Sequence, residues 1–326
     1  MRRREFITLL GSAVASWPLA VRAQEPAPIP VVGFLHLGRP DQAKAAVRPF
    51  SWGLADAGFV VDKTVEIDLR WANYDFSQLR AFAADLVKRQ VAVLFTANAL
   101  APARVAMRAT STIPIVFFYG GDPVEDGLVA SWNQPGGNVT GATGLQSELA
   151  GKRLGVLHEL VPQAKTVALL TIGTSSYTDR IVATARMLGF ELAVIVSIDS
   201  DRALESAFAT VVERQAGVLL INNDNFFLDR AAKLVELAEH HKIATMYPGS
   251  FFVRNGGLVS YGTNVVASYR QVASQFVGPI LKGSKPADLP IQRPRKFELV
   301  INVATAKALG LTIPRALLAA ATELID

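Results

Sequence analysis

The chain of 326 residues contains no cysteine. This absence excludes disulfides, thiolate metal sites and a cysteine nucleophile. A protein of this length can rely on its hydrophobic core instead of disulfides, so the absence fits an oxidising compartment without requiring one.

The sequence also lacks the common catalytic and phosphate-binding motifs. No serine stands in a G-x-S-x-G motif, and no G-x-G-x-x-G or G-x-x-x-x-G-K segment occurs. The four histidines, His36, His158, His240 and His241, do not have the H-E-x-x-H spacing of a zinc site. We therefore expect no enzymatic activity, no cofactor and no metal.

Outside the N-terminal segment, the chain carries little excess of positive over negative charge. The formal net charge is +5, but the first 23 residues alone carry +3, which leaves +2 for the rest of the chain. A basic groove for nucleic acid therefore has little support.

The N-terminal segment has the three parts of an export signal. Arg2, Arg3 and Arg4 precede an apolar stretch at residues 6–19, and small residues end it near Ala23. The order Arg3-Arg4-Glu5-Phe6-Ile7 resembles a twin-arginine signal. Residues 1–23 are expected to be cleaved near Ala23, which places the mature protein in the periplasm.

Strands and helices are expected to alternate along the remaining chain. Apolar runs of strand length lie at residues 31–36, 92–96 and 115–118, and amphipathic segments separate them. The same alternation restarts after residue 166. Since it is typical of βαβ units, the sequence predicts an α/β fold with two doubly wound parallel-sheet lobes.

The two lobes are expected to exchange chain segments. The N-terminal lobe is predicted to contain residues 30–145 and about 262–288, and the C-terminal lobe residues 146–261 and about 289–326. Crossings near residues 144, 262 and 290 would form a multi-strand hinge that guides a closing motion.

Polar and aromatic residues follow the predicted strands in both halves. In IPIVFFYGGDPV (113–124) a buried strand ends at two glycines, and Asp122 is expected to cap a helix that starts at Pro123. The run from 217 to 225, GVLLINNDN, has a similar layout. Ligands bind at the carboxyl edge of such sheets, so the candidate ligand contacts are Asn98, Tyr119, Asp122, Ser175, Ser176, Asn223, Asp224, Tyr247 and Tyr261.

Each candidate also has a purely structural interpretation. The acidic, amide and serine side chains could cap helices, and Tyr261 could pack the hinge. Their joint occurrence at strand ends in both halves favours a cleft between the lobes.

Several motifs together resemble one known family. The leader, IPIVFFYGGDPVEDGLVASWNQPGGNVTG (113–141), SYGTN (260–264), KPADLP (285–290) and FELVINVATAKALGL (297–311) are similar to the ABC-importer solute-binding family related to tryptophan and tyrosine receptors. The resemblance implies a type I periplasmic-binding-protein fold, docking on ABC permease and ATPase subunits, and ligand contacts near Asp122, Ser175, Asn223 and Tyr261. Tyr119-Gly120, Ala97-Asn98-Ala99 and Pro49 depart from many relatives.

The resulting hypothesis is a monomeric periplasmic receptor that captures a small amino-acid-like solute. Backbone N–H groups at Asp122 and Ser175 would bind an anionic group, and Asp122 or Asp224 would pair with an ammonium group. Two alternatives stay open: a ligand-sensing periplasmic protein for a membrane signalling partner, and an enzyme on a doubly wound fold.

Overall fold

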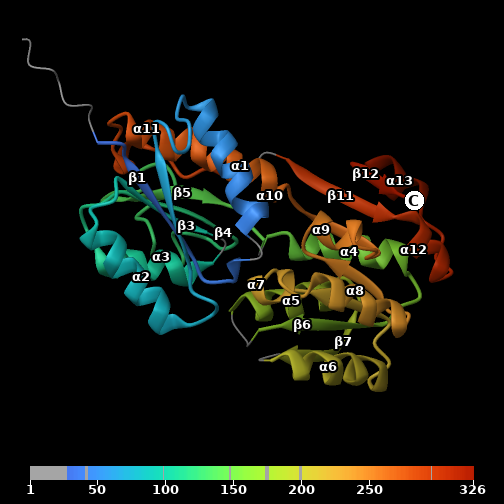
Figure 1. The fold of residues 1–326 in the computed structure, drawn as a ribbon. Coiled ribbons are helices and arrows are strands. Elements are labelled where there is room, and N and C mark those ends of the chain that lie inside the picture. Colours follow the sequence, from blue (N-terminus) through green and yellow to red (C-terminus); the bar gives the residue numbers. More distant parts are fainter. Residues whose placement is uncertain are drawn as a thin grey trace, which may run out of the picture.

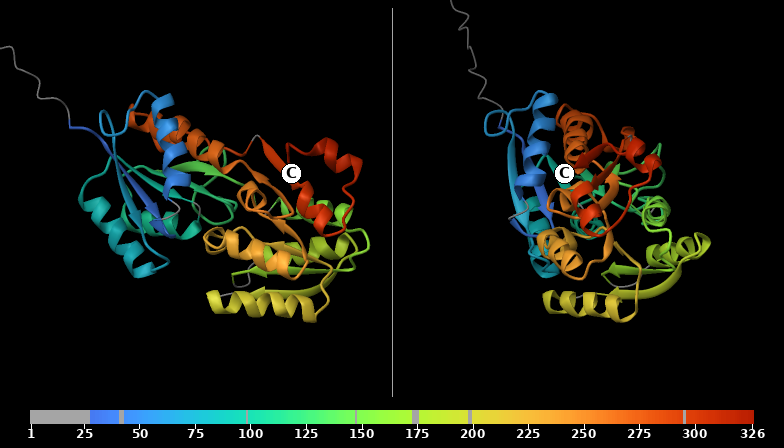
Figure 2. Two further views of the ribbon diagram at one scale, coloured as in Figure 1. Left: turned by 45° about the vertical axis from the view of Figure 1, so that its right-hand side comes forward. Right: turned by 90° about the vertical axis from the view of Figure 1, so that its right-hand side faces the viewer.

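The computed structural model describes residues 28–326 except 41–42, 98, 147, 173–175, 198–199 and 295. The predicted export signal lies outside the described residues. Two lobes stand side by side, and each contains a sheet with helices on both faces (Figures 1 and 2). This is the predicted α/β architecture of two doubly wound lobes.

The first lobe contains a five-stranded parallel sheet with strand order β2-β1-β3-β4-β5. Most of its central strands are fully buried because helices cover both faces, which explains their unbroken apolar runs. The elements of this part are β1 (Val31–His36), α1 (Ala43–Asp56), β2 (Glu66–Trp71), α2 (Phe76–Lys88), β3 (Val93–Ala97), α3 (Leu100–Ala109), β4 (Ile115–Tyr119) and β5 (Val139–Thr143).

The second lobe contains a seven-stranded sheet with strand order β12-β11-β10-β9-β8-β6-β7. Neighbouring strands are parallel except β10 and β11, which pair antiparallel. The elements are α4 (Ala150–Leu160), β6 (Thr166–Thr171), α5 (Ser176–Met187), β7 (Glu191–Ser197), α6 (Asp201–Glu213), β8 (Val218–Ile221), α7 (Asn225–Leu228), α8 (Ala231–His240), β9 (Ala244–Tyr247), α9 (Ser250–Arg254), β10 (Val259–Thr263), β11 (Phe297–Asn302), α12 (Val303–Ala308), α13 (Arg315–Ala320) and β12 (Glu323–Ile325).

A late segment returns to complete the core of the first lobe. Tyr269 is buried, and its ring packs near those of Phe34, Phe95 and Phe118. Gly53 of α1 permits a close crossing here, because a Cβ atom at this position would lie 2.1 Å from the carbonyl oxygen of Arg270. The returning elements are α10 (Val265–Val272), the π-helical segment η2 (Ala273–Val277), α11 (Gly278–Leu281) and the 3₁₀ turn η3 (Pro286–Asp288).

The third crossing of the chain between the lobes lies at a higher residue number than the sequence predicted. Thr140 donates to the carbonyl of Leu289 over 2.6 Å, and the N–H of Gln292 donates to the carbonyl of Gly141. Residues 289–292 therefore lie on the first lobe, whereas the sequence analysis assigned them to the second. The chain enters the second sheet at β11.

One further expectation was wrong. The segment after Asp122 is a single turn rather than a helix, and Gly127 follows it with a φ of +68° that ends helical geometry. Pro49 lies inside α1, which continues past it to Asp56. Among the described residues, no helix is long and apolar enough to cross a membrane.

Candidate functional site

Among the residues that the structure describes, three contacts bring the loop-bearing rims of the two lobes together. The hydroxyl of Tyr74 donates to Asp229 Oδ2 across the lobes. Arg180 Nη1 lies 3.5 Å from Glu125 Oε2. Gly120 lies so close to the second lobe that a Cβ atom there would be 3.5 Å from Asn223 Nδ2. These contacts show that the carboxyl edges of the two sheets face each other and touch.

The first-lobe rim includes a loop that positions Tyr74. The N–H groups of Asn73 and Tyr74 donate to the carbonyls of Gly38 and Leu37 over 3.0 and 2.7 Å. Gly38 is in turn held by its N–H bond to His36 Nδ1, at 2.8 Å. The loops that follow β1 and β2 therefore form one hydrogen-bonded unit.

His36 is a neutral acceptor at the base of this unit. Its ring is 3% exposed and packs against Trp71 with centroids 4.5 Å apart. Burial lowers the pKa of His36 to about 4. Because Nδ1 accepts a hydrogen bond, the single proton of the neutral ring resides on Nε2.

The loop after β4 is held by contacts within its own lobe. Tyr119 is buried and donates its hydroxyl to Asp126 Oδ2 over 2.9 Å. Asp122 Oδ1 accepts from the N–H groups of Val124 and Glu125 at 2.8 and 3.1 Å. The capping role expected for Asp122 is confirmed, on a turn rather than a helix. The N–H groups of Val124 and Glu125 are therefore already paired with Asp122.

The second-lobe rim follows β8 and carries a desolvated acid. Asp224 Oδ1 accepts from the N–H of Phe226 over 2.8 Å at the start of α7. Burial raises the pKa of Asp224, and this hydrogen bond opposes the rise. The preceding Asn222 donates its amide to Thr171 Oγ1, which ties the ends of β8 and β6 together.

An arginine and an aromatic ring stand beside this acid. The guanidinium carbon of Arg230 lies 3.6 Å from the centroid of the Phe226 ring, and Nη1 donates to the carbonyl of Phe226 over 3.0 Å. Burial raises the pKa of Tyr74, and the carboxylates of Asp229 and Asp224 raise it further, while Arg230 lowers it. Two carboxylates and one guanidinium group therefore act on the Tyr74 hydroxyl.

The predicted site residues fall into different places. Tyr119, Asp122, Asn223 and Asp224 lie on the facing rims. Ser176 begins α5, while Asn98 and Ser175 lie outside the described residues.

The prediction for Tyr247 is corrected by the structure. Its side chain is 1% exposed and stacks on Phe252 in the second-lobe core, with centroids 5.1 Å apart. It belongs to a cluster of buried side chains that includes Phe227 and Phe252, because its position in β9 directs it to that face of the sheet. Tyr261 is partly buried and stacks on Phe297, which is the hinge-packing role considered for it.

The hinge contains a buried charge that sequence reasoning missed. Arg153 of α4 is fully buried, and its Nε donates to the carbonyl of Tyr261 over 2.7 Å. Its Nη2 donates to Gln146 Oε1 and to the carbonyl of Pro248. Gln146 Nε2 continues the network to Thr263 Oγ1 at 3.3 Å. Arg153 thus links residues next to the first and second crossings.

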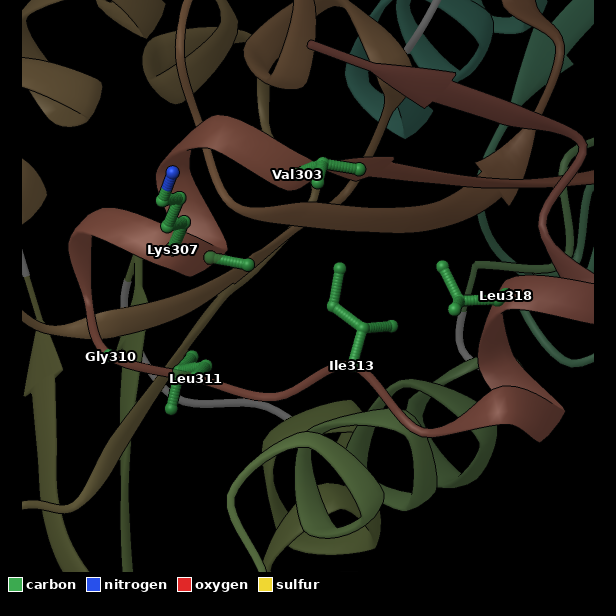
Figure 3. A pocket seen from close by; sticks show the side chains of 7 residues that line it. Val303, Lys307, Gly310, Leu311, Ile313 and Leu318 are labelled. Atoms are coloured by element: carbon green, nitrogen blue, oxygen red, sulfur yellow. The ribbon is translucent and has the colours of Figure 1, made fainter.

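Two open hollows lie elsewhere on the described surface. The first, about 430 Å³, is lined by C-terminal residues that include Val303, Lys307, Ile313 and Leu318 (Figure 3). The second, about 490 Å³, lies beside α10 and is lined by residues that include Asn264, Arg270 and Lys296. Neither lining set contains a rim residue.

The sequence and the fold match one family of proteins. Residues 37–325 match the model of the ABC transporter substrate binding protein family. A tyrosine-binding protein of Clostridioides difficile strain R20291 is 26% identical over 285 residues, which cover 86% of this chain and 81% of that protein.

Two solved structures share the whole two-lobe arrangement. A conserved domain protein of Vibrio cholerae O1 biovar El Tor has a TM-score of 0.83 and 26% identity, with 91% of this chain and 99% of that chain covered. The ABC domain in complex with L-Trp from Streptococcus pneumonia has a TM-score of 0.80 and 23% identity, with the same coverage.

Proposed function

The chain belongs to the ABC transporter substrate-binding protein family, and on that basis we propose that it is the solute receptor of an ABC importer. It captures a small amino-acid-like solute between its lobes and delivers it to permease and ATPase subunits. The observation that carries this proposal is the approach of the two rims, through Tyr74 and Asp229 and through Gly120 and Asn223. Rims that meet in this way enclose a guest when the lobes close.

The location of the receptor follows from the same role. A receptor that hands solute to a permease works outside the inner membrane, as a monomer in the periplasm. Residues 1–23 supply export, with cleavage near Ala23. Mass spectrometry of the protein from the producing cell checks this cleavage, and an uncleaved N-terminus contradicts it.

We assign the ammonium group of the solute to Asp224 rather than Asp122. The carboxylate of Asp224 is desolvated, and a desolvated anion gains most from a cationic partner. Asp122 already accepts two backbone N–H bonds through Oδ1, so its role is to shape the turn.

We assign the carboxylate of the solute to the N-terminus of α5. A helix of 12 residues carries the positive end of its dipole at its first turn, where backbone N–H groups have no partner within the helix. Ser176 begins α5, and Ser175 precedes it in the sequence, while Asn98 and Asn223 would supply amides to orient the solute. Tyr119 and Tyr261 shape the walls, since their rings pack against their own lobes.

The test is a binding titration with an amino-acid panel. The purified protein is titrated calorimetrically with the common L-amino acids, beginning with L-tyrosine and L-tryptophan. Asp224→Asn keeps an oxygen for the Phe226 N–H but removes the charge, so affinity falls at least about 10-fold.

Asp288→Asn is the matched control, because Asp288 is exposed on η3 of the first lobe. This variant keeps the parent affinity. Absence of binding to every amino acid in the panel contradicts the proposed solute class, and an equal loss in both variants contradicts the role of Asp224.

A further inference from the structure

A single side-chain hydrogen bond joins residues 155 positions apart across the two lobes. The Tyr74 hydroxyl, on the loop between β2 and α2, donates to the carboxylate of Asp229, which lies between α7 and α8. A second polar contact between described rim residues joins Glu125 and Arg180, whose side chains are 66% and 50% exposed. Solvent screens that ion pair, so it contributes less than a hydrogen bond in a half-buried place such as that of Tyr74.

The first lobe holds Tyr74 ready for this bond. Its φ is +65°, a left-handed conformation that is uncommon for a bulky residue and costs free energy. Two backbone hydrogen bonds from Asn73 and Tyr74 to the loop after β1 keep it there, and His36 supports that loop. The phenol therefore reaches the second lobe without further ordering of its backbone.

The surroundings strengthen the bond. Tyr74 is half-buried, and the nearby carboxylate of Asp224 adds to the field of Asp229 on the phenol. Both carboxylates keep the hydroxyl protonated, so it remains a donor. A hydrogen bond to a charged acceptor in a partly desolvated place is stronger than one in water.

We propose that Tyr74 and Asp229 form an interlobe latch that sets the equilibrium between closed and open lobes. The latch joins the two lobes to each other, so this proposal goes beyond solute capture. Since only closed lobes enclose a solute, the apparent affinity rises and falls with the closed fraction. Tyr74 is a positioning residue in this sense.

The chain offers a matched pair of substitutions. Tyr74→Phe removes a hydroxyl whose acceptor is on the other lobe. Tyr247→Phe removes a hydroxyl whose hydrogen-bond partner, Thr245, is on the same lobe. Both substitutions remove one hydroxyl from a tyrosine, but Tyr247 is buried in the second-lobe core, so only Tyr74→Phe removes a bond between the lobes.

The experiment measures the distance between the lobes directly. Because the chain has no cysteine, two introduced cysteines take spin labels without background. Lys88→Cys on α2 and Glu213→Cys on α6 place exposed labels on different lobes, and pulsed electron resonance gives the distribution of distances between them. Figure 1 shows the two helices on separate lobes.

Tyr74→Phe is expected to shift the distance distribution and to reduce the ratio of closed to open molecules about 10-fold. Tyr247→Phe leaves the distribution as in the parent. The proposal is overturned if Tyr74→Phe gives the parent distribution, or if both variants shift it equally. The melting temperature reports lobe stability separately.

Solute release gives a second measurement. With L-tyrosine or L-tryptophan as the probe, Tyr74→Phe is expected to speed dissociation about 10-fold. If another amino acid of the panel binds instead, it serves as the probe. If no amino acid in the panel binds, the solute class of the proposed function is wrong, while the distance measurement still decides on the latch.

Discussion

Because the histidine at the end of β1 is buried, we expect the free energy of unfolding to fall as the solution becomes acidic. His36 is 3% exposed, accepts the Gly38 N–H through Nδ1 and has a pKa of about 4, against 6.5 for the free side chain. Above pH 6.5 the ring is neutral in both native and unfolded protein, so the contribution of His36 to the free energy of unfolding is fully present. Between pH 6.5 and 4 the unfolded chain takes up the proton and the native protein does not.

The magnitude follows from the pKa difference. A shift of about 2.5 units corresponds to about 3 kcal/mol of unfolding free energy, lost at about 1.4 kcal/mol per pH unit as the pH falls from 6.5 toward 4. Protonation at Nδ1 would also remove the acceptor of Gly38 and release the loop beneath Tyr74. Loss of stability and loss of the rim arrangement are therefore expected together.

The assay is urea unfolding at several pH values between 7.5 and 4.5. His36→Asn supplies an oxygen near the position of Nδ1 but does not titrate, so the difference from the parent isolates the histidine. This difference is expected to shrink by about 1.8 kcal/mol between pH 7 and 5. His240→Gln, a change at an exposed histidine, serves as the control. A parent-to-variant difference that stays constant over this range refutes the reasoning.

Three substitutions test the packing around the site through the free energy of unfolding in urea. Gly262→Ala is expected to cost about 2 kcal/mol or more, because its Cβ would lie 2.4 Å from the carbonyl oxygen of Pro248; a smaller cost would show that the hinge can widen there. Gly155→Ala in α4 meets no atom within 4 Å and is expected to stabilise by about 0.5–1 kcal/mol, so destabilisation would contradict the open space. Asp75→Ala removes the cap that accepts from the Ser77 and Gln78 N–H groups and is expected to cost about 1 kcal/mol, whereas an unchanged value would mean that water replaces the cap.

The order of strands and helices was predictable because buried strands and amphipathic helices have recognisable hydrophobic patterns in the sequence. Strands covered by helices on both faces become unbroken apolar runs, as at β1, for which the predicted residues 31–36 match the structure. Turn residues then mark the ends of these strands, so the rim loops that carry Asp122 and Asp224 were also found.

What the sequence could not provide is contact between distant segments. Nothing local at Tyr74 indicates a left-handed backbone, since Gly or Asn is the usual residue there. Its acceptor, Asp229, lies on another lobe and 155 positions away. The same holds for Gly53, whose role depends on the carbonyl of Arg270.

The two errors at the site have physical causes. Asp-Pro predicts a first helical turn correctly, but it says nothing about how far the helix continues, and Gly127 stops it after one turn. Tyr247 follows the pattern of an aromatic at a strand end, yet its orientation depends on which face of the sheet position 247 occupies. A one-residue shift would have turned the ring toward the opposite face.

The hinge and the rims together explain how such lobes can separate without unfolding. Arg153 donates to Gln146, Pro248 and the carbonyl of Tyr261, and a buried guanidinium that lost these acceptors would destabilise the fold by several kcal/mol. The rim contacts are weaker and nearer to solvent, and Glu125 with Arg180 is the most exposed of them. We therefore expect opening to break the contacts at the rims and to leave the Arg153 network intact, so that the lobes would rotate about the crossings as rigid bodies.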